Sequence, residues 1–116
     1  MRCLTLKEPW ATLVREGKKT IETRTWRTSY RGPILITTSK MPRTGFAGMA
    51  IAVVDVLDCR IMTLEDEPAA CCAIYPRAQA WLLGNVRPIV PFATQGARGL
   101  FVDESVDSRI VFESAV

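Results

Sequence analysis

The 116-residue chain is 48% hydrophobic and 23% charged, with a formal net charge of +3, which excludes a disordered chain and predicts one folded domain over residues 1–116. Its longest strongly apolar stretch, residues 50–57, is far shorter than the roughly 20 residues that a membrane span needs. The N-terminal residues also lack the layout of a signal peptide. We therefore expect a cytoplasmic protein that does not bind membranes.

Metal-binding and cofactor-binding motifs are missing from the sequence. The chain has no histidine, and its four cysteines show no spacing typical of metal ligands. Neither a phosphate-binding loop nor a dinucleotide-binding motif is present. We therefore expect no metal and no cofactor, and we expect the cysteines to be reduced and mostly buried thiols.

Positive charge is concentrated in the first half of the chain. Between Arg15 and Arg43 there are eight basic residues and two acidic ones, whereas residues 55–67 contain five acids and one arginine. A local excess of positive charge attracts polyanions. This distribution predicts an anionic partner that meets the segment 15–43.

The first elements are a short strand over residues 2–6 and a helix that begins at Glu8-Pro9, because proline is well tolerated in the first turn of a helix. Trp10, Leu13 and Val14 follow at helical spacing, and Gly17 is typical of a helix end. Residues 20–26 then favour a strand, in which Glu22, Arg24 and Trp26 share one face. Because that face is charged, we expect it to point away from the core.

Further strands are predicted over residues 34–39, 48–57, 80–90, 99–102 and 109–112, and Gly84-Asn85 is expected to interrupt the strand over residues 80–90. Residues 48–57 are apolar enough to be buried on both faces at their start. Thr63 and Asp66 form a weak capping box before a short helix near residues 68–75. Many short strands with few helices predict an α+β fold, a small, partly closed β-barrel with one to three short flanking helices.

The segment from Gly17 to Arg24 carries the strongest chemical signal, because it places a lysine, a carboxylate and an arginine around the turn from the helix into the strand. Lys19, at the start of the strand, can surround a pocket together with Glu22 and Arg24. Cations bind phosphate, and a carboxylate accepts N–H groups of a base. The same residues could instead form a ladder of surface salt bridges, which stabilise little.

This segment resembles the G-x-K-x-x-E-x-R signature of ASCH domains, with Gly17, Lys19, Glu22 and Arg24 at the four specified positions. Residues 4–11, 25–32, 34–40, 81–88 and 96–101 are also similar to the order of motifs in that family. The resemblance implies a PUA-like β-barrel with a cleft lined by the signature residues, in a superfamily associated with RNA binding, RNA modification and catalysis. It also implies that the cleft has the following neighbours: Trp26, Tyr30, Arg31, Ser39 and Lys40.

The aromatic residues divide into core and cleft candidates. Trp10, on the apolar stripe of the helix, and Trp81 are expected in the core. Trp26 and Tyr30 are the candidates for stacking on a base, an interaction of roughly 1 to 3 kcal/mol.

The function expected first is binding of RNA or a modified nucleoside, since it requires only a cleft, a basic rim and an exposed aromatic ring. One ASCH branch hydrolyses acylated nucleosides such as acetylated cytidine with a lysine, a threonine three residues later and a downstream glutamate. Here Glu22 stands at the threonine position, and neither Glu65 nor Glu67 can be assigned as that downstream acid.

The same charged residues also fit a ribonuclease or a protein-interaction module. In a ribonuclease, Lys19 or Arg24 would stabilise the developing phosphorane while Glu22 deprotonates the ribose 2′-hydroxyl. In a protein-interaction module, the basic face would meet an acidic partner. The sequence does not specify the substrate or the oligomeric state.

Overall fold

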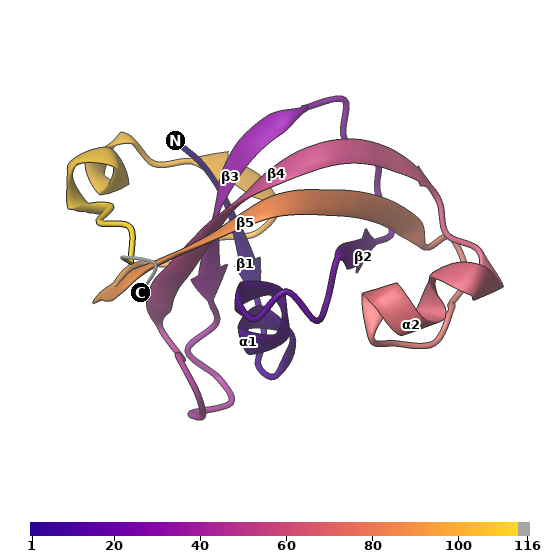
Figure 1. Ribbon diagram of the computed structural model, residues 1–116, viewed down its shortest axis with the longest axis horizontal. Helices are drawn as coiled ribbons and strands as arrows, with labels where there is room; N and C mark the ends of the chain where they lie inside the picture. Colours follow the sequence, from indigo (N-terminus) through magenta and orange to yellow (C-terminus); the bar gives the residue numbers. More distant parts are fainter. Residues whose placement is uncertain (114–116) are drawn as a thin grey trace.

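The computed structural model describes residues 1–113, which form one strongly curled sheet with short helices around it (Figure 1). The six strands lie in the order β2-β5-β4-β3-β1-β6, and all neighbours are antiparallel except β1 and β3. Their bounds are Arg2–Leu6 (β1), Ile21–Arg24 (β2), Gly32–Thr38 (β3), Met49–Ile61 (β4), Gln79–Ala93 (β5) and Leu100–Val102 (β6). The predicted small barrel is therefore present as a half-barrel.

The two longest strands, β4 and β5, arch over the other elements and give the sheet its curvature (Figure 1). Their pairing shifts register at three places, and Asn85 has a left-handed backbone with φ of 51°. A β-bulge inserts a residue on one strand and bends the ladder. The sequence predicted that Gly84-Asn85 interrupts the strand. The structure has instead a β-bulge there, within one continuous strand.

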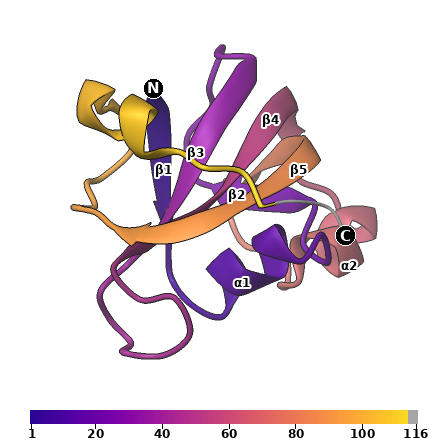
Figure 2. The same ribbon diagram turned by 60° about the vertical axis from the view of Figure 1, so that its left-hand side comes forward.

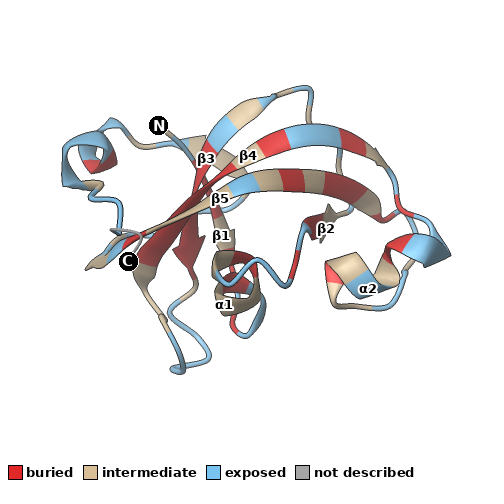
Figure 3. Ribbon diagram, viewed as in Figure 1, coloured by how far each residue is buried: buried red, intermediate tan, exposed pale blue. Residues whose placement is uncertain are grey.

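The interior of the curl is filled by apolar side chains and by one helix. Leu4, Ile36, Val54 and Trp81 are fully buried, and Trp81 is thus confirmed as a core residue. Helix α1 (Trp10–Arg15) adds buried Ala11 and Val14 and lies below β4 and β5 in Figure 3. The apolar start of β4 is buried on both faces, as predicted, because it lies in the middle of the sheet.

Trp10 contradicts its predicted place in the core, because 38% of its surface is exposed. It is the first residue of α1, and its indole Nε1 donates to the carbonyl of Cys71 at 3.4 Å. Ala11 and Val14 are the helix residues that are buried, while Trp10 lies beside the segment that follows α2. The helical spacing placed Trp10 on the apolar stripe but did not show where that stripe ends.

The other helices are short. A 3-10 turn, η1 (Leu64–Asp66), leads into α2 (Glu67–Ala70), which ends well before the predicted Tyr75 because Cys71 takes a left-handed backbone. A second 3-10 helix, η2 (Glu104–Arg109), lies beside the N-terminus (Figure 2). The strand predicted over residues 109–112 is wrong, because only an isolated bridge joins Phe112 to Ile89.

No helix within residues 1–113 is both long and apolar enough to cross a lipid bilayer.

Candidate functional site

The turn after α1 directs the signature residues into the half-barrel. Gly17 has a φ of 77°, a conformation that favours glycine, and the amides of Lys18 and Lys19 both donate to the carbonyl of Leu13. The chain then enters β2, where Glu22 pairs with Trp81 of β5. Gly17 therefore positions Lys19 and β2 without lining a pocket itself.

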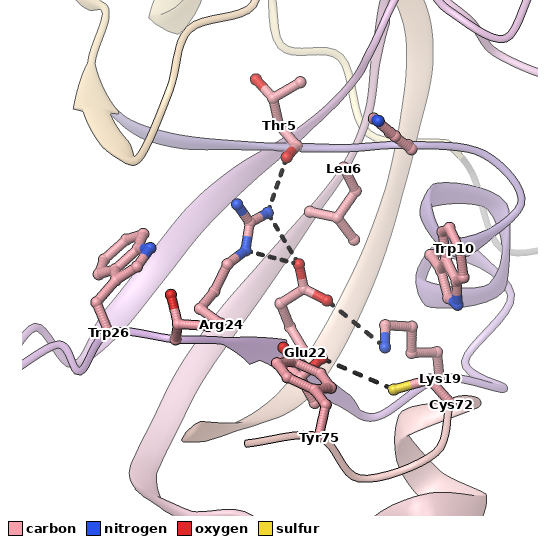
Figure 4. A pocket seen from close by; sticks show the side chains of 12 residues that line it. Thr5, Leu6, Trp10, Lys19, Glu22, Arg24, Trp26, Cys72 and Tyr75 are labelled. Atoms are coloured by element: carbon pink, nitrogen blue, oxygen red, sulfur yellow. Dashed lines mark hydrogen bonds and ion pairs between the residues drawn. The ribbon is translucent and has the colours of Figure 1, made fainter. Parts of the chain in front are cut away.

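Lys19, Glu22 and Arg24 form one connected cluster of charges. The Lys19 ammonium donates to the Ala70 carbonyl at the end of α2 and lies 3.5 Å from Glu22 Oε1. Arg24 Nε and Nη2 lie 3.0 and 2.9 Å from Glu22 Oε2, and Nη2 also donates to the Thr5 carbonyl at 2.8 Å (Figure 4). The cluster thus connects β2 to β1 and to α2.

The charged face of β2 is partly buried, contrary to the expectation that it points to solvent, although the Arg24 side chain stays 22% exposed. Lys19 is 1% exposed and Glu22 is 7% exposed. The reason is the curl of the sheet, which brings β2 opposite β1 although three strands separate them in the sheet order. Arg24 bridges these two strands, and a ladder of surface salt bridges is therefore not what the structure contains.

The cluster holds two cations and one carboxylate, and it keeps unused hydrogen-bonding capacity. A lysine ammonium has three donors and an ionised carboxylate accepts at about four positions. Among the described residues, Lys19 Nζ contacts two acceptors, and Arg24 Nη1 has no hydrogen-bond partner. The cluster therefore has donors and acceptors available for a further polar group.

A pocket of about 540 Å³ opens directly on the cluster, and we call it the charged pocket. Figure 4 shows Trp10 and Trp26 on opposite sides of the Glu22 carboxylate, with Tyr75 below it in this view. The Trp26 ring is held by Trp81, whose ring meets it edge-on with centroids 4.9 Å apart. Aromatic walls around a charged floor suit a flat, polar ring.

A second cavity of about 740 Å³ adjoins the charged pocket, and we call it the basic groove. The two share part of their walls, including Arg24 and Trp26. Its other charged or buried polar wall residues are Lys7, Thr38, Lys40 and Arg98. No acidic side chain of the described residues lines it.

The structure brings most of the predicted site residues to these two cavities. Lys19, Glu22 and Arg24 line the charged pocket, Trp26 lines both, and Ser39 with Lys40 lines the basic groove. Tyr30 and Arg31 lie elsewhere: the Tyr30 hydroxyl donates to the Pro33 carbonyl at 2.8 Å, and the Arg31 guanidinium donates to the carbonyls of residues 28 and 30. These two side chains stabilise the loop before β3.

The predicted basic segment does not form a single face. Arg15 is mostly buried and donates to the carbonyls of Ile51 and Ile89. Lys18 is exposed, and its Nζ lies 3.7 Å from Glu16 Oε1. Two of the cations in the basic groove, Lys7 and Arg98, come from outside that segment. The groove therefore owes its charge to the fold more than to the run of basic residues.

The cavity residues that sequence reasoning missed include Lys7, Trp10, Cys72, Tyr75 and Arg98. Lys7 directly follows the first strand, and Arg98 stands between two glycines, which is a composition typical of a surface loop that contacts ligands. Cys72 and Tyr75 carried no comparable signal, because they come next to Lys19 only through the packing of α2.

No cluster of metal-ligating side chains occurs in the part of the chain that the structure describes. The molecule is a small half-barrel in which two adjoining cavities lie over a cluster of charged side chains. The model of the ASCH domain matches residues 4–92, and the chain therefore belongs to the ASCH domain family.

Solved structures agree with this fold. The crystal structure of an ASCH protein from Zymomonas mobilis is 16% identical, with 93% of this chain and 90% of that chain covered and a TM-score of 0.73. Two point-mutant forms of the Zymomonas mobilis protein are also 16% identical, each with a TM-score of 0.68; they cover 93% and 94% of this chain and 94% and 95% of their own. None of the curated proteins matches the chain.

Proposed function

We propose that the protein binds RNA or a modified nucleoside, with one base held in the charged pocket. The observation that carries this proposal is the cluster of buried Lys19 and Glu22 with half-buried Arg24, which lines a pocket that also has aromatic rings in its wall. A base presents N–H donors and ring or carbonyl acceptors on its edge and an apolar face above and below. The cluster offers both donors and acceptors, and the rings offer the faces.

Glu22 and the two cations have complementary tasks in this proposal. The carboxylate accepts N–H groups of the base through the capacity that its contacts leave free, while Lys19 Nζ and Arg24 Nη1 donate to a carbonyl or ring nitrogen. These hydrogen bonds form in a pocket from which water is excluded, where an unpaired polar group is unfavourable. A base whose donors and acceptors do not match those of the cluster would therefore bind weakly.

The geometry supports binding better than hydrolysis of an acylated nucleoside. Glu65 is exposed, and the Glu67 carboxylate accepts the amide of Ile74 at 2.7 Å, so neither acid lies among the residues that line the charged pocket. Thr23 does line it, with its hydroxyl 3.7 Å from the sulfur of Cys72. A ribonuclease and a partner-binding module remain as outcomes of the test.

The test uses a random hexaribonucleotide and a panel of acylated nucleosides, incubated with the wild-type protein and with Glu22→Gln. Binding is followed by retention over a series of salt concentrations, and products are followed by mass spectrometry. We expect retention that weakens with salt, because bound phosphates release counterions, and a loss of retention on the order of tenfold or more in Glu22→Gln.

Either of two results contradicts binding as the function. Product that forms with wild type and not with Glu22→Gln would make the protein an enzyme. Absence of retention at low salt, or retention that Glu22→Gln leaves unchanged, would remove the charged pocket as the binding site. Thermal melting of both proteins controls for folding.

A further inference from the structure

The basic groove is a built cavity whose wall is fixed by side-chain contacts. The loop between β5 and β6 lies against β1, because the amide of Ala97 donates to the Thr5 hydroxyl at 3.4 Å. The same hydroxyl lies 2.8 Å from the Thr37 hydroxyl on β3. A Cβ atom at Gly96 would lie only 3.2 Å from the Thr5 side chain, so glycine permits this close approach. The contacts hold the loop that carries Arg98 beside the groove.

Three of the four cations that line the groove lack acidic partners among residues 1–113. Lys7 and Arg98 are exposed and form no ion pair within residues 1–113, and Lys40 meets only the neutral amide oxygen of Gln95, at 3.4 Å. Arg24, the fourth cation, is already paired with Glu22. Three unpaired cations around one cavity repel one another, and an anion in the cavity would relieve that repulsion.

A second observation at the groove also points to a ligand. Thr38 is 2% exposed and lines the groove, and its hydroxyl has no hydrogen-bond partner among the described residues. A buried hydroxyl without a partner is unfavourable by about 1 to 3 kcal/mol, which is why such groups are rare. Rotation of the Thr38 side chain toward the groove would let this hydroxyl donate to an oxygen atom of a ligand.

We infer that the basic groove binds the phosphate of a nucleotide whose base occupies the charged pocket, so that the ligand is a phosphorylated nucleotide within RNA and not a free nucleoside. The inference rests on the proposed function. Its basis is that the two cavities adjoin. They share the following wall residues: Thr5, Leu6, Lys7, Arg24 and Trp26. One nucleotide could therefore place its base in the charged pocket and its phosphate in the basic groove. Lysine and arginine side chains are the usual partners of phosphate oxygens.

The experiment compares four kinds of ligand: the four ribonucleosides, their 5′- and 3′-monophosphates, a random hexaribonucleotide and inorganic phosphate. Affinities are measured for wild type, for Glu22→Gln, for the groove variant Lys40→Ala/Arg98→Ala, and for the control Lys18→Ala/Arg43→Ala. Hexaglutamate is added to wild type as a competing acidic peptide. The control removes the same charge from exposed residues that line neither cavity. Thermal melting shows whether each variant is folded.

We expect wild type to bind monophosphates and the hexamer at least tenfold more tightly than nucleosides at low salt. The groove variant should lose about ten- to one-hundredfold of its affinity for the hexamer, and its salt dependence should become shallower. Its affinity for nucleosides should stay within about twofold of wild type, and the control should change little for every ligand. Inorganic phosphate should compete with monophosphates in wild type only.

Three results would overturn the inference: equal wild-type affinity for nucleosides and monophosphates, equal weakening by the two double variants, or competition by hexaglutamate as effective as that by the hexamer. The last would indicate an acidic peptide as the ligand. If Glu22→Gln weakens binding of every nucleic-acid ligand while the groove variant weakens none, the inference fails and the proposed function stands. If wild type binds none of these ligands, the proposed function itself fails.

Discussion

Asp66 and Glu22 are both buried carboxylates paired with an arginine, yet their surroundings differ. Asp66, 6% exposed, accepts from both Nη atoms of Arg60 at 2.7 and 2.8 Å and from the amide and hydroxyl of Thr63 at 2.8 and 3.2 Å. Four donors match the acceptor capacity of a carboxylate. Asp66 lines neither the charged pocket nor the basic groove.

Glu22 has a less complete set of partners. Its two cations are Arg24, which also binds the Thr5 carbonyl, and Lys19, which also binds the Ala70 carbonyl. The carboxylate lines a pocket of about 540 Å³. Both carboxylates pair with an arginine, but the Arg60–Asp66 pair uses the whole acceptor capacity of its carboxylate to fix a turn. The Arg24–Glu22 pair leaves part of that capacity unused, and this is the difference between the two sites.

The largest expected effect tests the structural role of Asp66. Asp66→Ala should lower the free energy of unfolding by about 2 to 3 kcal/mol, because two charge-assisted hydrogen bonds and the cap of the turn at Thr63 are lost. Binding of the hexaribonucleotide by the folded fraction should stay unchanged. Urea denaturation and a binding titration on the same sample measure both quantities.

A loss of affinity in Asp66→Ala without a loss of stability would break the comparison, because it would place Asp66 in the binding machinery. Asp58→Ala is the matched control: its side chain is 56% exposed and its contact with Arg31 is long, at 3.4 Å. Surface ion pairs of this kind contribute little, so the control should alter the unfolding free energy by less than about 1 kcal/mol.

At Glu22, loss of a partner should affect binding as well as stability. Lys19→Met should lower the free energy of unfolding by about 1 to 2 kcal/mol, because the buried Ala70 carbonyl loses its donor. Glu22 keeps its pair with Arg24 in this variant. Affinity for the hexaribonucleotide should fall by about 2 kcal/mol, as expected for the loss of a hydrogen bond from a charged donor.

Lys18→Met is the control for Lys19→Met, since the neighbouring lysine is 66% exposed and lines neither cavity. Fluorescence anisotropy with the labelled hexamer measures the affinity, and thermal melting measures stability. If Lys19→Met were strongly destabilised and the folded fraction bound RNA normally, the cluster would be a structural closure between β2, β1 and α2 and not a binding site.

The sequence could predict the members of the cluster but not its burial. Lys19, Glu22 and Arg24 lie on one strand and its entry, so local spacing alone places them together. Periodicity shows which residues share a face, but it does not show what covers that face. The cover comes from β1, which the curl of the sheet brings opposite β2, and from α2, which lies in the connection between β4 and β5.

The walls of the two cavities were also beyond local reasoning. Trp10, Tyr75 and Arg98 come from segments far apart in the chain, and the fold alone brings them to the two cavities. The fold class was predictable because the strands, their turns and the signature are local features. The bulge at Asn85 shows the limit, since a left-handed residue can end a strand or bend one, and only the pairing of β4 with β5 decides.

The smallest expected effect concerns acid. The hydrogen bonds from Arg60, and then that from the Thr63 amide, hold the pKa of Asp66 well below its usual range. The unfolded chain therefore takes up this proton first as the pH falls below about 4, so the stability from Asp66 is present above that pH and is lost below it. By pH 3 the loss should be on the order of 1 kcal/mol.

The measurement is the difference in unfolding free energy between wild type and Asp66→Asn, which should shrink by that amount between pH 6 and pH 3. Arg60→Gln keeps the carboxyl and removes the main cause of its low pKa, so it should show the same weakened dependence on pH as Asp66→Asn. A difference that stays constant over this range would mean that Arg60 does not hold the charge of Asp66. The contrast between a fully paired and a partly paired carboxylate would then have no thermodynamic basis.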